Sequence, residues 1–355
     1  MYAYVGCYTS PDRGGRGEGI GIYRVDPTSG AWISVALAAG VANPSFLALH
    51  PDGNTLYCVH GGNDHSRVSA FARDRASGEL TLLNSQPSGG RNPVHLSFEP
   101  TGRLLVVANY TEGTVAALPV AVDGTPGAPG SILNLTGTLG PDPVEQASLH
   151  PHHSPFDPAG SFVVVPDKGL DRLFIFRPDV ASGMIAPHEP PSVATRAGAG
   201  PRHIAFARNA PYAYVINELD STVTTYAYDA AAGTLEPLQT ISSLPADFAG
   251  KNSGAEIAVA PSGRFVYLSN RGHDSIGAFA VSEQDGTLTP RAWTPSGGAT
   301  PRFFALDPAG TFFFAANQDS DTIVTFRVDP ATGALTATGE VVATGSPCCI
   351  VFADA

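Results

Sequence analysis

The chain has 355 residues, among them 39 glycines and 31 prolines, and a formal net charge of −12. This turn-rich composition runs along the whole length, which excludes a domain of long helices and favours many short strands. The acidic balance argues against nucleic acid or an anionic membrane as the main partner, although a few clustered arginines could still hold a small anion.

The N-terminus has neither the basic nor the apolar region of a secretion signal, and the apolar runs are too short to span a membrane. The four cysteines show no zinc-type spacing and no dense disulfide framework; they are Cys7, Cys58, Cys348 and Cys349. We therefore expect a cytoplasmic protein with reduced thiols, present as a monomer or a weak homo-oligomer.

One block of sequence recurs along the chain. Residues 43–53 carry a Pro-Asp-Gly turn and run into an apolar strand, and residues 92–102 repeat the pattern with Pro-Thr-Gly. The block returns at Pro151, Pro201, Gly254, Pro301 and Pro347, at intervals of 46 to 58 residues. Recurrence at this period is typical of repeat architectures such as propellers.

The seventh copy of the block is split between the chain ends. Residues 346–355 stop where a second strand should begin, and residues 2–9 supply a matching strand. Joining the two ends closes a ring and leaves only short, protected sheet edges. We predict an all-β, seven-bladed β-propeller with four-stranded antiparallel blades, forming one domain over residues 1–355.

The copy that begins at Pro201 illustrates the expected blade. Its four strands are predicted at 202–207, 213–217, 222–228 and 235–241. A Gly precedes the last strand here, in Ala232-Gly-Thr-Leu, and again in Asp285-Gly-Thr-Leu and Thr332-Gly-Ala-Leu. Glycine supplies the positive φ that tight hairpins need.

The start of each innermost strand and the turn after the second strand should lie on one rim of the ring. These positions gather the unusual polar residues of the chain. The strand starts give His95, His150, His152, His153, Arg202, His203, Asn252, Glu256 and Arg302. The turns give His60, Asn109, Asp167, Lys168, Asn217, Glu218, Asn270, Arg271, Asn317 and Gln318. We predict one pocket at one mouth of the ring.

Several of these residues also have a structural interpretation. The repeated asparagines are typical of turns, where they cap their own backbone. Arg202 and Arg271 suit rigid recognition of a carboxylate or phosphate, but a salt bridge to Glu218 or Glu256 would use them equally well. His150 and His152 share one face of a strand and could chelate a metal, but no third ligand has matching spacing, so neither metal nor cofactor is expected.

Two motifs resemble a known family. Gly200-Pro-Arg-His-Ile-Ala-Phe, followed by Tyr214-Val-Ile-Asn-Glu-Leu-Asp-Ser, is similar to the signature of the 6-phosphogluconolactonase-type lactonase propellers, a family that includes carboxymuconate lactonizing enzymes. The resemblance runs from Tyr4-Val-Gly-Cys-Tyr-Thr to Gly345-Ser-Pro. It implies a hydrolase of carbohydrate metabolism that opens 6-phosphoglucono-δ-lactone in the pentose phosphate pathway.

The resemblance also implies roles for individual residues. The catalytic set would be His152, Arg202, Glu218 and Arg271. Substrate binding is expected from Glu256, His150, His153, His203, Asn109, Asn270 and Arg302, around a small anionic lactone. Either His152 or Glu218 could act as the general base, and which histidine of the 150–153 tract faces the site stays open.

Two alternatives remain. A carboxymuconate-type lactonizing activity, or a lactonase acting on another small anion, would use the same arginines to hold carboxylates. A non-catalytic propeller would act as an interaction platform, since fold alone does not determine function. Convergence of Arg, His and Glu, where a platform would show exposed aromatic residues, favours the enzyme.

Overall fold

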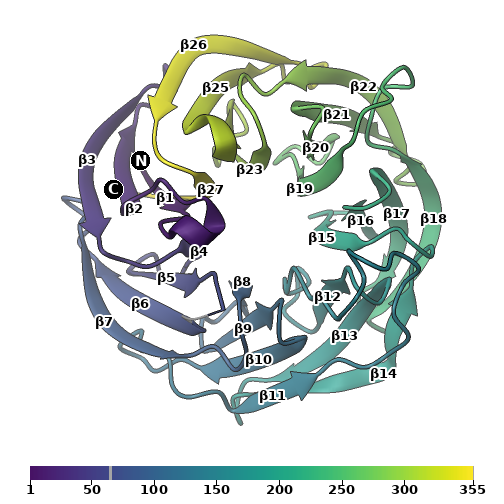
Figure 1. Ribbon diagram of the computed structural model, residues 1–355, viewed down its shortest axis with the longest axis horizontal. Helices are drawn as coiled ribbons and strands as arrows, with labels where there is room; N and C mark the ends of the chain where they lie inside the picture. Colours follow the sequence, from purple (N-terminus) through teal and green to yellow (C-terminus); the bar gives the residue numbers. More distant parts are fainter. Residues whose placement is uncertain (64–65, 355) are drawn as a thin grey trace.

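The computed structural model describes residues 1–63 and 66–354, which form a ring of seven antiparallel sheets (Figure 1). This confirms the predicted seven-bladed propeller. Residues 64, 65 and 355, the last being the end of the predicted 1–355 domain, lie outside the described residues. No described segment is a helix long and apolar enough to cross a membrane.

The blades follow one another around the ring in chain order, each with its first strand innermost (Figure 1). Blade 1 contains β4 (Pro44–Leu49), β5 (Thr55–His60), β6 (Arg67–Arg73) and β7 (Leu80–Pro87). Blade 2 contains β8 (Pro93–Phe98), β9 (Leu104–Asn109), β10 (Thr114–Pro119) and β11 (Ser131–Asn134). Blade 3 contains β12 (Val163–Asp167), β13 (Arg172–Asp179) and β14 (Met184–Ala194).

The second half of the ring repeats the pattern. Blade 4 contains β15 (Pro201–Phe206), β16 (Tyr212–Asn217), β17 (Thr222–Asp229) and β18 (Thr234–Ser242). Blade 5 contains β19 (Ser253–Val259), β20 (Phe265–Arg271), β21 (Ser275–Val281) and β22 (Leu288–Pro295). Blade 6 contains β23 (Pro301–Leu306), β24 (Phe312–Asn317), β25 (Thr322–Val328) and β26 (Leu335–Ala343). Two short 3-10 turns, η1 (Pro11–Arg13) and η2 (Gln318–Ser320), follow β1 and β24.

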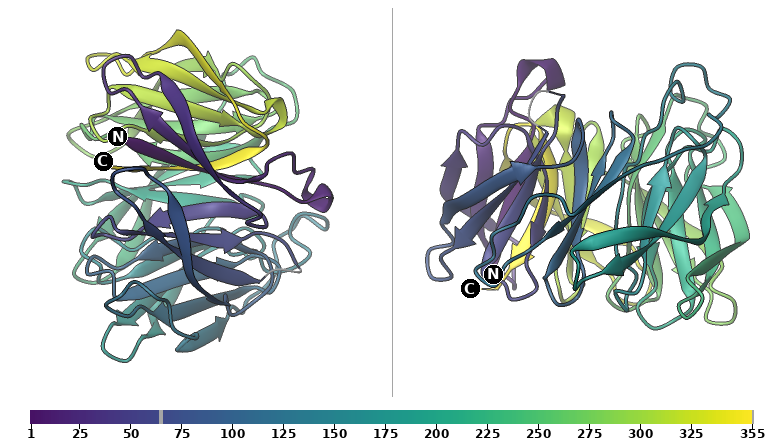
Figure 2. Two further views of the ribbon diagram at one scale, coloured as in Figure 1. Left: turned by 90° about the vertical axis from the view of Figure 1, so that its left-hand side faces the viewer. Right: turned by 90° about the horizontal axis from the view of Figure 1, so that it is seen from below.

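Blade 7 closes the ring with both ends of the chain. Its order is β27 (Pro347–Ala353), β1 (Tyr2–Cys7), β2 (Gly19–Val25) and β3 (Trp32–Ala39). β1 and β27 are antiparallel, with Tyr2 opposite Ala353 and Val5 opposite Ile350. The two ends of the chain therefore lie side by side (Figure 2).

Blade 3 departs from the regular pattern at its innermost strand. The segment there is reduced to two isolated bridges, Pro151 with Asp167 and Phe156 with Val163. Pro151 and Pro155 have no amide hydrogen, so neither residue can donate to the ladder. The segment still occupies the inner position, because the His152 amide donates to the carbonyl oxygen of Pro166.

Contacts between blades are apolar, with a recurrent polar connection. The second strands are almost entirely buried, as in β9 and β24. A tyrosine on a second strand reaches the last hairpin of the following blade, where its hydroxyl donates to a glycine carbonyl: Tyr4 to Gly78 (2.9 Å), Tyr214 to Gly286 (3.1 Å) and Tyr267 to Gly333 (2.8 Å). Each such bond contributes about 1 kcal/mol.

The innermost strands share one irregularity. The pairing of first and second strands skips one residue after the leading proline, for example between Pro201 and His203 and between Pro301 and Phe303. In β19 the skip is wider, between Gly254 and Ile257. A β-bulge of this kind re-aims the extra side chain. The inner strands begin at one opening of the ring, which we call the front mouth. The bulges therefore determine which side chains point to the front mouth.

Candidate active site

Two sets of side chains surround the front mouth. The bulge ring is formed by the residue after each leading position; its members are Ser45, Val94, His152, Arg202, Ala255, Arg302 and Cys348. The turn ring is formed by the residue that ends or follows each second strand; its members are Tyr8, Gly61, Tyr110, Lys168, Glu218, Arg271 and Gln318. The repeat thus brings residues far apart in sequence to one place.

Glu218 is the centre of the charged contacts at the front mouth. Its Oε2 lies 3.1 Å from Arg202 Nε and 3.3 Å from Arg271 Nη2, and its Oε1 lies 3.6 Å from Lys168 Nζ. The Arg202 Nε contact is an ion pair without hydrogen-bond alignment. The salt bridges that the sequence allowed as an alternative are therefore present.

The charges at the mouth shift several pKa values. Burial raises the pKa of Glu218, but Arg271, Lys168, Arg202 and Arg302 outweigh it and hold the value at about 2. Burial, together with the neighbouring Arg271 and Arg302, lowers the pKa of Arg202 to about 9. At neutral pH both groups are charged, and Glu218 is a weak base.

Backbone carbonyls hold the two arginines in place. Arg202 Nη1 donates to the carbonyl oxygen of Ala255 (2.6 Å), and Arg271 Nη2 donates to that of Gly254 (3.2 Å). Both acceptors belong to the wide bulge of β19. The guanidinium groups are thus fixed by the fold as well as by Glu218.

Arg302 differs from the other cations of the mouth. It forms no ion pair within the described residues, and its guanidinium lies over the ring of Tyr8, 5.4 Å from the centroid. Arg13 of η1 packs on the same ring at 4.7 Å and donates to the Tyr8 hydroxyl (3.0 Å). Arg302 is therefore a cation held by packing, with its charge available to a ligand.

A long connection in blade 3 adds a carboxylate to the mouth. The interval between Pro93 and Pro151 is the longest of the repeat, and the extra chain carries Glu145 to Lys168, with 2.8 Å between Oε2 and Nζ. Glu145, Glu218 and Arg271 are among the residues that line a groove of about 940 Å³. Its other charged lining residues are Asp142, Asp220 and Lys251, and its lining does not include His152, Arg202 or Arg302. This groove is large enough for a phosphorylated sugar acid.

Below the bulge ring lies a layer of buried and half-buried side chains, formed by the next residue of each inner strand. Its members are Phe46, His95, His153, His203, Glu256, Phe303 and Cys349. His153 stacks on His203 with 4.1 Å between ring centroids, and His95 meets His153 edge-on at 4.0 Å. This layer forms the floor of the mouth.

The floor is connected to the bulge ring by a chain of hydrogen bonds. His152 Nδ1 lies 3.1 Å from His203 Nε2, and His203 Nδ1 lies 3.1 Å from Glu256 Oε1. Burial, with Arg202 as a neighbouring cation, lowers the pKa of His152 and His203 well below the usual range. Burial raises the pKa of Glu256 to about 8, against the lowering effect of Arg202.

The predicted histidines occupy different levels of the site. His152 belongs to the bulge ring, whereas His153 lies in the floor, where its Nδ1 accepts the amide of Ile204 (3.2 Å). His203 also lies in the floor. His150 stacks on Tyr110 at the mouth, with ring centroids 4.2 Å apart. Of the 150–153 tract, His152 combines a place at the mouth with a link to the floor.

The predicted asparagines form structural hydrogen bonds with backbone carbonyl groups. Asn109 Nδ2 donates to the carbonyl oxygen of Ser88 (3.0 Å), and Asn270 Nδ2 donates to that of Ser243 (3.0 Å). Asn317 makes the equivalent bond to Ser296. The structural interpretation accounts for these contacts, and we leave Asn109 and Asn270 out of the proposed site.

A metal at His150 and His152 has no support in the geometry. The ring nitrogens of His150 face Tyr110 and Ser148, while His152 Nδ1 faces His203. Within residues 1–63 and 66–354, no group of three or more His, Cys, Asp or Glu side chains is placed to hold a metal ion.

The catalytic and substrate-binding sets predicted from the sequence omitted Lys168, which the predicted rim included, and also Tyr8 and Tyr110, which it did not. Lys168 contacts Glu218 and lies over the Tyr110 ring, 5.4 Å from its centroid. All three residues occupy the position that follows the second strand, as Glu218 does. Aligning the seven copies at this position would have identified them.

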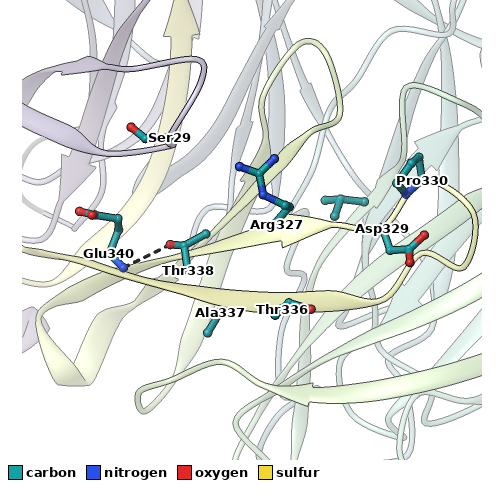
Figure 3. Close-up of a pocket in the computed structure, with 9 residues that line it drawn as sticks. Ser29, Arg327, Asp329, Pro330, Thr336, Ala337, Thr338 and Glu340 are labelled. Carbon is teal, nitrogen blue, oxygen red and sulfur yellow. Dashed lines mark hydrogen bonds between the residues drawn. The ribbon is translucent and has the colours of Figure 1, made fainter.

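A second groove, of about 800 Å³, lies on the outer side of the ring between β25, β26 and the turn at Ser29 (Figure 3). Arg327, Asp329 and Glu340 line it together with threonines. Figure 3 shows these side chains spread along the strands without converging on one point. It therefore lacks the arrangement found at the front mouth.

Comparison with known proteins places this chain in a family. The family model described as a lactonase, 7-bladed beta-propeller, matches residues 2–352. A 6-phosphogluconolactonase of Bacillus subtilis is 36% identical over 304 residues, covering 86% of this chain and 84% of that protein. One of Serratia proteamaculans is 34% identical over 270 residues, 76% of each chain.

Similar solved structures are described as lactonases as well. A periplasmic gluconolactonase of Pseudomonas aeruginosa superposes with a TM-score of 0.91 at 32% identity, covering 99% of this chain and 98% of that one. A putative 6-phosphogluconolactonase of Bacteroides fragilis gives a TM-score of 0.92 at 31% identity, with the same coverage. These comparisons confirm the predicted resemblance and the prediction of a lactonase. The chain belongs to the seven-bladed β-propeller lactonase family.

Proposed function

We propose that the front mouth hydrolyses a small anionic sugar lactone, with 6-phosphoglucono-δ-lactone as the first candidate. The observation that carries this proposal is the charge of the mouth. Within the bulge ring and the turn ring, four cations outnumber one carboxylate, Glu218, in a chain whose net charge is −12; the cations are Lys168, Arg202, Arg271 and Arg302. A local excess of cations in an acidic protein favours an anionic ligand.

The cations divide into two groups with different roles. Arg202 and Arg271 are fixed by Glu218 and by backbone carbonyls, which suits preorganised donors aimed at the oxyanion of a tetrahedral intermediate. Arg302 has no carboxylate partner in the described part of the chain, and it would bind the phosphate group.

His152 is the general base in this proposal. Its imidazole is neutral at pH 7, since burial lowers its pKa, whereas four cations hold Glu218 ionised, with a pKa of about 2. His152 takes a proton from water, and the oxygen of that water attacks the lactone carbonyl carbon. The ring C–O bond then breaks, and the leaving oxygen receives the proton from His152, giving the open hydroxy acid.

Relatives named 6-phosphogluconolactonase support the phosphorylated substrate, and the Pseudomonas aeruginosa gluconolactonase supports the unphosphorylated one. The carboxymuconate alternative would place carboxylates against the same cations. Cytoplasmic location and a monomeric or weakly associated state stay predictions.

The experiment is steady-state hydrolysis of phosphorylated and unphosphorylated gluconolactone by wild type and Arg302→Gln. Losing a charge-assisted bond to phosphate lowers kcat/KM for the phosphorylated substrate by about 10- to 100-fold. The unphosphorylated substrate should change by no more than about threefold. Arg327→Gln in the outer groove is the matched control and should leave both substrates unaffected. Equal loss on both substrates would refute the phosphate role of Arg302.

A further inference from the structure

The floor of the mouth contains a hydrogen-bonded chain, Glu256–His203–His152, that the lactonase mechanism above does not use. All three side chains are buried, and they come from blades 5, 4 and 3. We propose that Glu256 and His203 are positioning residues that hold His152 in the tautomer with a proton on Nδ1 and a free electron pair on Nε2. This inference rests on the proposed function, in which His152 is the base.

The order of donors and acceptors in this hydrogen-bonded series is set at its Glu256 end, where a backbone amide contacts the carboxylate. Glu256 Oε1 accepts the amide hydrogen of Ile257 at 3.0 Å, so this oxygen is an acceptor. The same oxygen lies 3.1 Å from His203 Nδ1. Both oxygens of an ionised carboxylate can only accept, so His203 Nδ1 carries the proton when Glu256 is ionised.

The tautomer of His203 determines that of His152. A neutral imidazole protonated on Nδ1 has an acceptor at Nε2. His203 Nε2 faces His152 Nδ1 at 3.1 Å, so His152 donates from Nδ1 and keeps its electron pair on Nε2. This order of donors and acceptors is that of the ionised Glu256 carboxylate, or of a carboxyl group protonated on Oε2, which is buried without a partner among the described residues. A proton on Oε1 would donate to His203 Nδ1 and reverse the order.

Packing fixes the planes of the two rings. His203 stacks on His153 with 6° between ring planes, and the amide of Ile204 fixes His153 in turn. The ring of Tyr110 meets His152 edge-on, with centroids 5.5 Å apart. Arg202, Arg302 and Lys168 are the charged groups that act on His152, and all three disfavour a second proton on it. The tautomer therefore places the free electron pair on Nε2, while the three cations lower the basicity of that nitrogen.

The direct test is the side-chain ¹⁵N spectrum of histidine-labelled protein at pH 7, with the His152 signals assigned by their loss in His152→Gln. We expect a protonated Nδ1 and an unprotonated Nε2 for both His152 and His203. A protonated Nε2 on His152, or a doubly protonated ring, would overturn the inference. This readout needs no substrate, so it is independent of the proposed function.

Variants of Glu256 test the consequence for catalysis. Glu256→Gln keeps a carbonyl acceptor for Ile257 and His203, and we expect the same tautomers and a kcat within about threefold of wild type. Glu256→Met keeps the length of the side chain but removes the acceptor, and kcat should fall by about 10- to 100-fold, toward loss of the general base. KM should stay within about twofold in both variants.

Substitutions in the floor separate positioning from packing. His203→Phe keeps a stacked ring but removes both nitrogens, so kcat should fall as in Glu256→Met. His188→Phe replaces a buried, hydrogen-bonded histidine of β14 that lies outside the floor and should leave kcat unchanged within about threefold. Equal losses in Glu256→Gln and Glu256→Met, or in the two Phe variants, would refute the positioning role. A wild type without activity on any lactone would refute the proposed function instead, and the ¹⁵N result would still stand.

Discussion

Replacing Glu218 with glutamine should destabilise the protein in a strongly pH-dependent way. Burial raises the pKa of Glu218, but four cations, Arg271, Lys168, Arg202 and Arg302, outweigh it and hold the pKa at about 2, below its usual 4.5. Each pK unit corresponds to about 1.4 kcal/mol, so the ionised carboxylate contributes about 3 kcal/mol to the free energy of unfolding. Because the folded pKa lies below the unfolded one, this contribution is complete above about pH 4.5 and is lost as the pH falls toward 2. Breaking a buried ion pair commonly costs a similar amount, about 3–5 kcal/mol.

The assay is urea unfolding of wild type and Glu218→Gln at several values between pH 7 and pH 3. We expect a difference of about 3 kcal/mol at pH 7 that shrinks as the pH falls below 4.5. Glu145→Gln is the matched control, since Glu145 contacts the same Lys168 but its side chain is 50% exposed. An exposed pair contributes about 1 kcal/mol or less. Equal destabilisation by the two variants, or a Glu218→Gln difference independent of pH, would refute the reasoning.

Two further predictions concern stability and reactivity. Glu256 keeps its proton up to about pH 8 when folded but releases it near pH 4.5 when unfolded, so stability falls as the pH rises between these values. Glu256→Gln removes this loss and should stabilise the protein by about 3 kcal/mol at pH 7, with no gain below about pH 4, measured by the urea midpoint; equal midpoints at pH 7 would contradict it. All four cysteines are buried, and burial raises the pKa of the Cys58 thiol to about 12, so Ellman's reagent should react with them only after unfolding. Rapid reaction of the native protein would contradict the described burial.

The ring could be predicted from sequence because each blade repeats its turn chemistry. The Pro-x-Gly turns and the split seventh copy determine the closure, since the strand at Tyr2 pairs on one edge with β2 and on its inner edge with the segment after Pro347. The regular interval also placed Arg202, Glu218 and Arg271 at one mouth. In the structure both arginines are within ion-pair distance of Glu218. Periodicity in the chain thus becomes proximity in space.

The sequence left open which histidine faces the mouth, because this depends on the register of the innermost segment to within one residue. His152 and His153 differ by one position, and a bulge decides which of them points to the mouth and which lies in the floor. The prolines of blade 3 alter this segment further, by reducing its strand to two bridges. Glu145 reaches Lys168 on a long connection that has no counterpart in the other blades, so the repeat could not indicate it.

The most direct test of the account is the rate of hydrolysis of freshly prepared 6-phosphoglucono-δ-lactone, measured against its spontaneous rate, for wild type and His152→Gln. We predict turnover well above the spontaneous rate for the wild type. His152→Gln should lose at least about 100-fold in kcat, as expected for a missing general base, while its unfolding midpoint stays close to that of the wild type. A wild type that does not exceed the spontaneous rate, or a folded His152→Gln that retains full activity, would contradict the assignment of the front mouth as the lactonase site.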